Sequence, residues 1–173
     1  LMAKSPKLIN DIPVRAYQFS VGESSYWLEY GNKPLYPFGY GLTYTTFKYG
    51  PVVLSDTLLA SSSHPLTASC EITNTGKCDA VAVPQLYIRD VVGSLTRPIR
   101  ELKGFQRVSI PAGESRTVDF QISEKDLAYW HLAEGASLGS EGEYVFSAEK
   151  GDFRVWIAPN AAEGEYARFA LVE

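Results

Sequence analysis

Residues 117–122 read Thr-Val-Asp-Phe-Gln-Ile, and residues 66–73 read Leu-Thr-Ala-Ser-Cys-Glu-Ile-Thr, so that apolar and polar side chains alternate in both stretches. Successive side chains of a strand point to opposite faces, and the alternation therefore predicts two strands that each bury one face. Residues 81–88 form a denser apolar run that contains Pro84. Because proline has no N–H to donate to a ladder, we expect a strand there with Pro84 at a sheet edge or a bulge.

Shorter alternating segments follow along the chain. Residues 108–110 predict a short strand before the turn sequence Pro-Ala-Gly-Glu. Residues 144–148 and 153–157 alternate on either side of Lys-Gly-Asp at 150–152, which predicts a hairpin whose two arms are these stretches. A last strand is expected near 167–172.

One short helix is predicted among these strands. Ser123 is an N-cap residue, and Asp126 follows it three positions later, which is the spacing of a capping sequence before Leu127. About seven short strands, turns every 8 to 12 residues or so, and almost no helix predict an all-β fold. We expect an antiparallel two-sheet sandwich of the immunoglobulin or fibronectin type III kind.

The N-terminal part of the chain has a different character. Of the 22 aromatic residues, 11 fall between Tyr17 and Tyr49, interleaved with glycine and proline and without helical or strand periodicity. Each buried aromatic side chain removes about 150–250 Å² from water. We therefore expect an extended, aromatic-rich N-terminal segment that packs its rings against the domain behind it or against a partner.

Composition restricts the class of protein. The chain has 173 residues, an apolar fraction of 45%, a charged fraction of 21% and a net charge of -4, which fit one ordinary globular domain. The chain has no excess of lysine and arginine that would indicate a nucleic-acid-binding protein. The sequence contains no apolar run of about 20 residues that would predict a membrane span, and no signal-type stretch follows its first residues.

The cysteines and histidines predict neither a disulfide scaffold nor a metal centre. Cys70 and Cys78 are eight residues apart, and we interpret them as free thiols, with a bridge between neighbouring strands as the alternative. His64 and His131 have no zinc-ligand spacing relative to the cysteines, and we interpret both as surface or loop residues. No metal and no cofactor are predicted.

Residues 34–47, Pro-Leu-Tyr-Pro-Phe-Gly-Tyr-Gly-Leu-Thr-Tyr-Thr-Thr-Phe, carry a family resemblance. They resemble the junction that leads into the fibronectin type III-like C-terminal domain of family 3 glycoside hydrolases, of the β-glucosidase and β-xylosidase type. Further blocks are similar to that domain in the same order. They are 73–77, 85–90, 96–98, 101–105, 112–115 and 142–144.

The resemblance implies a domain organisation and a function. Residues 1–36 would be the tail of the preceding catalytic α/β sandwich domain with its linker, and residues 37–173 the fibronectin type III-like sandwich. The implied function is a non-catalytic accessory domain that stabilises the catalytic domains by packing, since both catalytic carboxyl groups of the family belong to the upstream domains. The alternative is a carbohydrate-binding or protein-interaction module that acts alone. The cellular location stays open, with a periplasmic or secreted location favoured.

Charged residues that could suggest chemistry have a simpler interpretation. Glu141 and Glu143 are interpreted as solvated loop residues rather than as a catalytic pair. The sequence Gly-Tyr-Gly at 39–41 lacks the third glycine of a nucleotide loop, and we assign its glycines to a tight aromatic corner. A second charged group is interpreted as a structural ion-pair network. It consists of Arg97, Arg100, Glu101 and Lys103.

Aromatic side chains are the remaining candidates for a binding site, because tyrosine and tryptophan rings can stack on sugars. The candidates are Trp27, Tyr36, Tyr40, Trp130 and Trp156. We expect them to pack against protein rather than against sugar, and the sequence assigns no substrate-binding residue.

Overall fold

The computed structural model of the chain describes residues 35–60, 65–133 and 144–172, and the chain divides into two units, Leu1–Tyr40 and Gly41–Glu173. In the first unit, residues 37–40 form a turn in which the Tyr40 N–H donates to the Pro37 carbonyl at 3.1 Å. Gly39 has φ 79°, a left-handed conformation that glycine adopts without strain. This turn agrees with the aromatic corner predicted for Gly39, whereas Gly41 follows the turn and does not have a positive φ.

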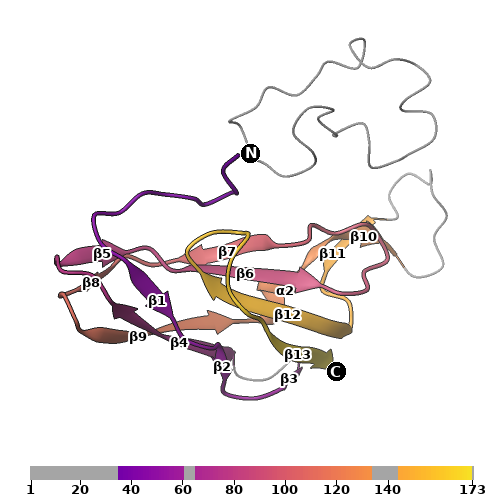
Figure 1. Ribbon diagram of the computed structural model, residues 1–173. Helices are drawn as coiled ribbons and strands as arrows, with labels where there is room; N and C mark the ends of the chain where they lie inside the picture. The colour runs from indigo at the N-terminus through magenta and orange to yellow at the C-terminus, as the bar shows by residue number, and fades with distance from the viewer. Residues whose placement is uncertain (1–34, 61–64, 134–143, 173) are drawn as a thin grey trace, which may run out of the picture. The chain divides into compact units, whose positions relative to one another are not determined.

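One layer of the second unit is a four-stranded sheet built on β4, Leu66–Asn74 (Figure 1). β4 pairs antiparallel with β9, Ser115–Ile122, from Leu66 opposite Ile122 to Thr73 opposite Ser115. Two shorter strands, β1 (Phe47–Tyr49) and β2 (Val53–Leu54), also pair with β4. The two clearest alternating stretches of the sequence are therefore strands, as predicted, and they lie side by side.

The other layer is a five-stranded sheet in the order β3-β13-β12-β6-β7. Its strands are β3 (Leu58–Ala60), β13 (Ala167–Val172), β12 (Gly151–Ala158), β6 (Gln85–Asp90) and β7 (Glu101–Phe105). Neighbours are antiparallel except β3 and β13, which run parallel. The last strand has the bounds that the sequence predicts.

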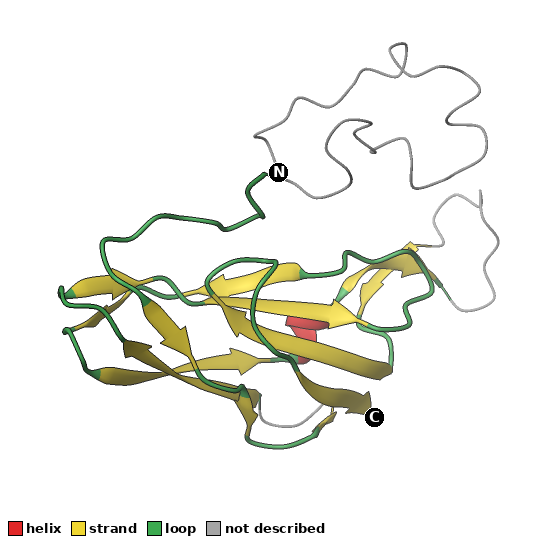
Figure 2. Cartoon of the chain, viewed as in Figure 1, coloured by secondary structure: helices red, strands yellow, loops and turns green. Residues whose placement is uncertain are grey.

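Two small sheets and one short helix complete the part of the chain that the structure describes (Figure 2). β5 (Ala80–Ala82) pairs with β8 (Val108–Ile110), and β10 (Tyr129–Leu132) pairs with β11 (Tyr144–Ser147). The helix is α2, Glu124–Leu127. The backbone N–H and the hydroxyl of Ser123 both donate to Oδ2 of Asp126 at 2.7 Å, which confirms the predicted cap.

The hydrophobic core lies between the two large sheets. Alternate residues of β4, β9, β12 and β6 point into it, because each strand buries one face. They include Ala68, Cys70, Ile72, Val118, Phe120, Ile122, Phe153, Val155, Ile157, Leu86 and Ile88. The predicted all-β sandwich of two layers is therefore correct.

Two predictions of strand organisation are wrong. Residues 81–88 are not one strand: the ladder stops at Val83 and Pro84, and the chain passes from the small sheet of β5 into β6 in the middle of the large sheet. Residues 144–148 and 153–157 do not form a hairpin. β11 pairs with β10, whereas β12 pairs with β6 and β13, so residues 148–150 connect two different sheets, and the predicted turn residues Gly151 and Asp152 already belong to β12.

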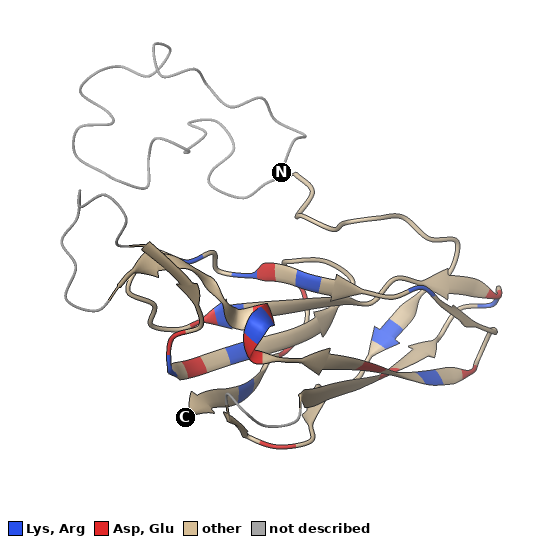
Figure 3. Ribbon diagram, turned by 180° about the vertical axis from the view of Figure 1, so that it is seen from behind, with Lys and Arg blue, Asp and Glu red and all other residues tan. Residues whose placement is uncertain are grey.

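Charged residues of both signs are interspersed along the described strands and along α2 (Figure 3). Within the described ranges no helix has the length and apolar character needed to cross a membrane.

Candidate functional site

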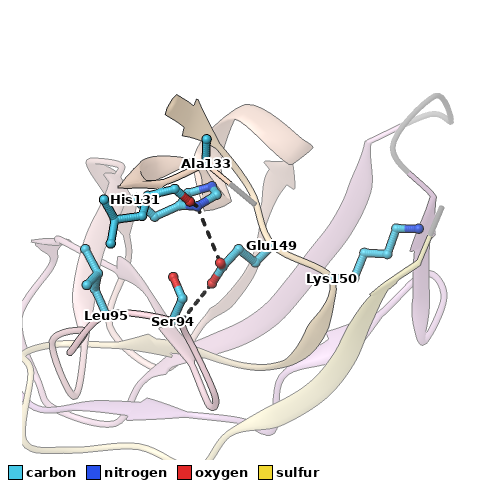
Figure 4. Close-up of a pocket in the computed structure, with 7 residues that line it drawn as sticks. Ser94, Leu95, His131, Ala133, Glu149 and Lys150 are labelled. Atoms are coloured by element: carbon cyan, nitrogen blue, oxygen red, sulfur yellow. Dashed lines mark hydrogen bonds and ion pairs between the residues drawn. The ribbon is translucent and has the colours of Figure 1, made fainter. Parts of the chain in front are cut away.

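The candidate site is a pocket of about 450 Å³ in the second unit (Figure 4). Three segments form it: the loop after β6, strand β10, and the residues between β11 and β12. Its lining consists of Ser94, Leu95, His131, Leu132, Ala133, Glu149 and Lys150. Because these segments are far apart in the sequence, the pocket depends on contacts that hold them together.

Glu149 makes most of those contacts. Its Oε2 accepts hydrogen bonds from the backbone N–H of Ser94 at 2.8 Å and from the hydroxyl of Tyr129. Its Oε1 lies 3.4 Å from Nδ1 of His131. Figure 4 shows the Glu149 carboxylate between Ser94 and His131. One carboxylate therefore joins the loop after β6 to β10.

His131 is held on both sides of its ring. Nε2 lies 2.8 Å from the hydroxyl of Ser147 on β11, and Nδ1 lies 2.9 Å from the carbonyl of Leu132. Both oxygens near Nδ1 are acceptors, those of Leu132 and Glu149, so Nδ1 carries a proton. The prediction that His131 is a surface or loop residue is wrong, because it is buried in a strand.

The electrostatics of the site keep Glu149 ionised. Burial raises the pKa of the Glu149 carboxyl, but hydrogen bonds from Tyr129 and Ser94 outweigh it and leave the pKa below its ordinary value. Burial, with the hydrogen bond to Glu149, raises the pKa of the Tyr129 hydroxyl. Tyr129 is thus a proton donor and Glu149 an acceptor throughout the neutral range.

Arg97 lies over the ring of Tyr129, the residue that donates to Glu149. Its guanidinium carbon lies 4.0 Å from the centroid of the Tyr129 ring, which is a cation–π contact. Its Nη2 lies 2.7 Å from Oε2 of Glu101, whose Oε1 lies 2.8 Å from Nζ of Lys103. The predicted ion-pair network is therefore confirmed for three of its four members, and Arg100 lies outside it.

Asp90 is the second acidic group of this region. Its Oδ1 accepts from the N–H of Val92 at 3.1 Å, and burial raises the pKa of the carboxyl. Among the described residues, Oδ2 of Asp90 and Nε of Arg97 are buried side-chain atoms without a hydrogen-bond partner. Asp90 does not line the pocket, so it does not face Glu149 across a space that a substrate could fill.

This geometry is suited to holding segments together rather than to cleaving a glycoside. A glycosidase needs two carboxyl groups on opposite sides of the scissile bond, one of them protonated. The described lining contains one carboxylate, Glu149, whose oxygens both have partners and whose lowered pKa makes it a poor acid. Within the described ranges no group of three potential metal ligands occurs.

The aromatic candidates fall into two groups. Trp156 is 4% exposed, with the Arg100 guanidinium 4.4 Å from its ring centroid and the Tyr166 ring 5.4 Å away, so it packs against protein as expected. Trp130 is 64% exposed, and its ring lies 5.5 Å from that of Phe146, which is 57% exposed. In the first unit, the rings of Tyr36 and Tyr40 stack at 5.0 Å.

Four predicted residues lie outside the described ranges. They are Trp27, His64, Glu141 and Glu143. Both cysteines are unbridged: Cys70 is buried in β4, and Cys78 is exposed. The sequence did not single out Glu149, because a glutamate two residues before a glycine carries no signal until burial and partners are known.

Comparison with known proteins gives the context of the site. Residues 82–161 match the model of the fibronectin type III-like domain. The chain is 34% identical to a periplasmic β-glucosidase of Salmonella typhimurium, over 96% of this chain and 22% of that protein. It is 36% identical to a putative β-xylosidase of Formosa agariphila, over 96% of this chain and 20% of that protein. The chain thus spans about a fifth of the length of these relatives.

Solved structures show the same fold. A β-glucosidase of Erythrobacter marinus matches with a TM-score of 0.73 and 30% identity, over 87% of this chain and 19% of that one. A β-glucosidase of Listeria innocua in complex with glucose matches with a TM-score of 0.72 and 27% identity, over 85% of this chain and 19% of that one.

Proposed function

Because the chain belongs to the fibronectin type III-like domains that family 3 β-glucosidases and β-xylosidases carry, we propose that it is a non-catalytic accessory domain of a glycoside hydrolase. The parent enzyme acts on β-linked glycosides, and this domain stabilises its catalytic part by packing against it. One observation carries the proposal. Nearly the whole chain, 96%, aligns with a β-glucosidase, but it accounts for only 22% of that protein.

The exposed apolar residues before β1 support packing as the mode of action. Leu42 is 90% exposed and Tyr44 is fully exposed, at 100%. Leu35, Phe38 and Tyr40 are also exposed large apolar residues. Exposed apolar side chains of this kind, in each of the two units taken separately, are typical of residues that another protein part covers. We assign residues 1–36 to the tail and linker of the preceding catalytic domain, and residues 37–173 to the accessory domain.

The polar cluster around Glu149 has a supporting role in this proposal. It fixes the loop after β6 and the β10–β11 pair on the sandwich, so that their outer surfaces are rigid when they meet the catalytic part. A rigid surface loses less conformational entropy on packing than a mobile one.

An activity measurement on the isolated chain tests the non-catalytic assignment. We expect no hydrolysis of p-nitrophenyl β-glucoside or β-xyloside above the buffer rate at any pH between about 4 and 8. Hydrolysis that the E149Q variant abolishes would instead assign the pocket as an active site. The E124Q variant, which changes a glutamate of α2 outside the pocket, is the matched control.

A second candidate function rests on the exposed pair of Trp130 and Phe146. The two residues are directly opposite each other on β10 and β11, and their rings lie 5.5 Å apart. Exposed aromatic rings on a rigid strand pair can stack on the apolar face of a sugar. Calorimetric titration with gluco- and xylo-oligosaccharides tests it: binding that the W130A variant removes supports a carbohydrate-binding module, and a silent titration excludes that function.

A further inference from the structure

Three arginines form a row across the outer face of the five-stranded sheet. Arg154 of β12 is the register partner of Arg89 on β6 and of Arg168 on β13. The neighbours of Arg154 along its strand, Phe153 and Val155, belong to the buried core, so the arginine side chains lie on the face that points away from it. We call Arg89, Arg154 and Arg168 the arginine row.

The row places like charges next to each other across neighbouring strands. Like charges directly opposite each other on neighbouring strands are destabilising, and this row contains two such pairs. The ion pairs found in the described ranges involve Arg97, Lys103, Arg116 and His131. Among the described residues, then, no carboxylate lies within 4.0 Å of any member of the row. Asp152 of β12 acts on Arg168 over a longer distance and, after the Tyr166 hydroxyl, contributes to raising its pKa, so Arg89 and Arg154 carry most of the charge that a partner could neutralise.

Aromatic rings hold the guanidinium groups in place. The ring centroid of Tyr166 lies 4.7 Å from the guanidinium carbon of Arg154 and 5.4 Å from that of Arg168. Nη2 of Arg168 also lies 3.1 Å from the Tyr166 hydroxyl. Tyr166 packs in turn on the buried ring of Trp156. Two members of the row are thus positioned before any partner arrives, which lowers the entropy lost on binding.

We propose that the arginine row binds carboxylate side chains on the surface of the catalytic part of the parent protein. This proposal rests on the proposed function, because it identifies a contact between the accessory domain and the part that it stabilises. A guanidinium group presents paired N–H donors that match a carboxylate, and it is more weakly hydrated than an ammonium group. The row covers two inter-strand spacings, about 10 Å, which one acidic patch on a protein can match.

Two observations favour a protein surface over a sugar. The chain spans 22% of its β-glucosidase relative, so most of the surface of such a protein belongs to other parts of it. Neutral β-glycosides carry no charge and would leave the like-charge repulsion of the row in place. A partner with aspartate or glutamate side chains offsets that repulsion directly.

The test uses the 173-residue chain and a hexaglutamate peptide as the probe. Nuclear magnetic resonance of the arginine Nε–H groups should show shifts at Arg89, Arg154 and Arg168 at low salt, and these shifts should disappear at high salt because exposed ion pairs are screened. The R154Q variant should weaken peptide binding by about fivefold or more. The control R116Q, which changes an exposed arginine of β9 in the other layer, should weaken it by less than about twofold.

A stability measurement separates a binding row from a structural one. Because R154Q relieves two like-charge contacts but also removes the cation–π contact with Tyr166, its melting temperature should stay within about 3 °C of that of the unchanged chain. A fall of more than about 3 °C would assign Arg154 a structural role and overturn the proposal. The proposal is also overturned if the peptide moves none of the three Nε–H signals, if R116Q weakens binding as much as R154Q, or if oligogalacturonate binds the row more tightly than the peptide.

A failure of the arginine-row proposal can be distinguished from a failure of the proposed accessory function. Peptide binding requires only this chain. If the isolated chain hydrolyses aryl glycosides while the row still binds the peptide, the accessory function fails but the carboxylate site stands. If the chain is inactive and the peptide does not bind, the accessory function stands and the row is not its contact.

Discussion

The hydroxyl of Thr45 donates a hydrogen bond of 2.6 Å to Oδ1 of Asn74, a side chain that is fully buried at 0% exposure. The Asn74 side-chain nitrogen donates to the carbonyls of Cys78 at 2.8 Å and Ile110 at 2.9 Å, and Oδ1 also accepts from the Gly76 N–H at 3.1 Å. Asn74 therefore ties together the segment before β1, the turn after β4 and the end of β8.

Replacing Asn74 by alanine should destabilise the domain strongly. The N74A variant leaves buried carbonyl groups and an N–H without their partner, and we expect the free energy of unfolding in urea to fall by about 2–4 kcal/mol. The T73A variant is the control, because Thr73 makes one side-chain bond, to the Ser115 hydroxyl, and should cost about 1 kcal/mol or less. Equal losses in the two variants would contradict the central position of Asn74.

Adding a side chain at Gly76 should destabilise the domain as long as Thr45 is present. A Cβ at Gly76 would lie 2.0 Å from Oγ1 of Thr45, so the G76A variant must displace the hydroxyl that bonds Asn74. We expect a loss of about 1–3 kcal/mol in the free energy of unfolding. The G41A variant is the matched control, since a Cβ there meets nothing within 4 Å.

A double variant tests whether the cost of G76A comes from the clash with the Thr45 hydroxyl. In T45A/G76A the obstructing hydroxyl is absent, and the two losses should be less than additive by about 0.5 kcal/mol or more. Additive losses would show that the effect of G76A comes from the backbone and not from Thr45.

Removing the Glu149 carboxylate should change the pH dependence of stability. The pKa of Glu149 is lowered in the folded domain, so its contribution is present above the unfolded pKa of about 4.3 and is lost as pH falls through the folded pKa. The E149Q variant should therefore be less stable than the unchanged chain at pH 7, by about 1–2 kcal/mol. Urea unfolding should show this difference shrinking between about pH 5 and pH 3, and a difference that stays constant over that range would contradict the assignment.

The sequence predicted the strands whose alternation is strict. β4, β9 and β13 each bury one face in a core, and the period of two is a direct record of that environment. The helix cap was also predictable, because Ser123 and Asp126 interact over three residues. Strand pairing was not. Residues 144–148 and 153–157 satisfy a hairpin pattern equally well, and only packing in three dimensions determines that β11 pairs with β10.

The candidate site was less predictable than the fold. Glu149, Ser94 and Tyr129 come from three segments, and none has a motif that marks it. The arginine row escaped prediction for the same reason: Arg89, Arg154 and Arg168 meet only through strand register. Trp156 was predictable as a packed residue because large rings are mostly buried. Its cation–π contact with the Arg100 guanidinium could not be predicted.

The exposed residues before β1 should be dispensable in the isolated chain. Leu42 and Tyr44 have almost no contact with the sandwich, so the L42S/Y44S variant should keep its free energy of unfolding within about 0.5 kcal/mol. A loss above about 1.5 kcal/mol in urea unfolding would mean that these side chains serve the domain itself.

Thermal unfolding of a chimera tests the accessory function most directly. In the periplasmic β-glucosidase of Salmonella typhimurium, the segment that matches this chain is either deleted or replaced by this chain. The chimera should melt several degrees above the deletion variant, because a packed domain stabilises the folded catalytic part, and L42S/Y44S should remove part of that gain. A chimera that melts at the same temperature as the deletion variant would contradict the account.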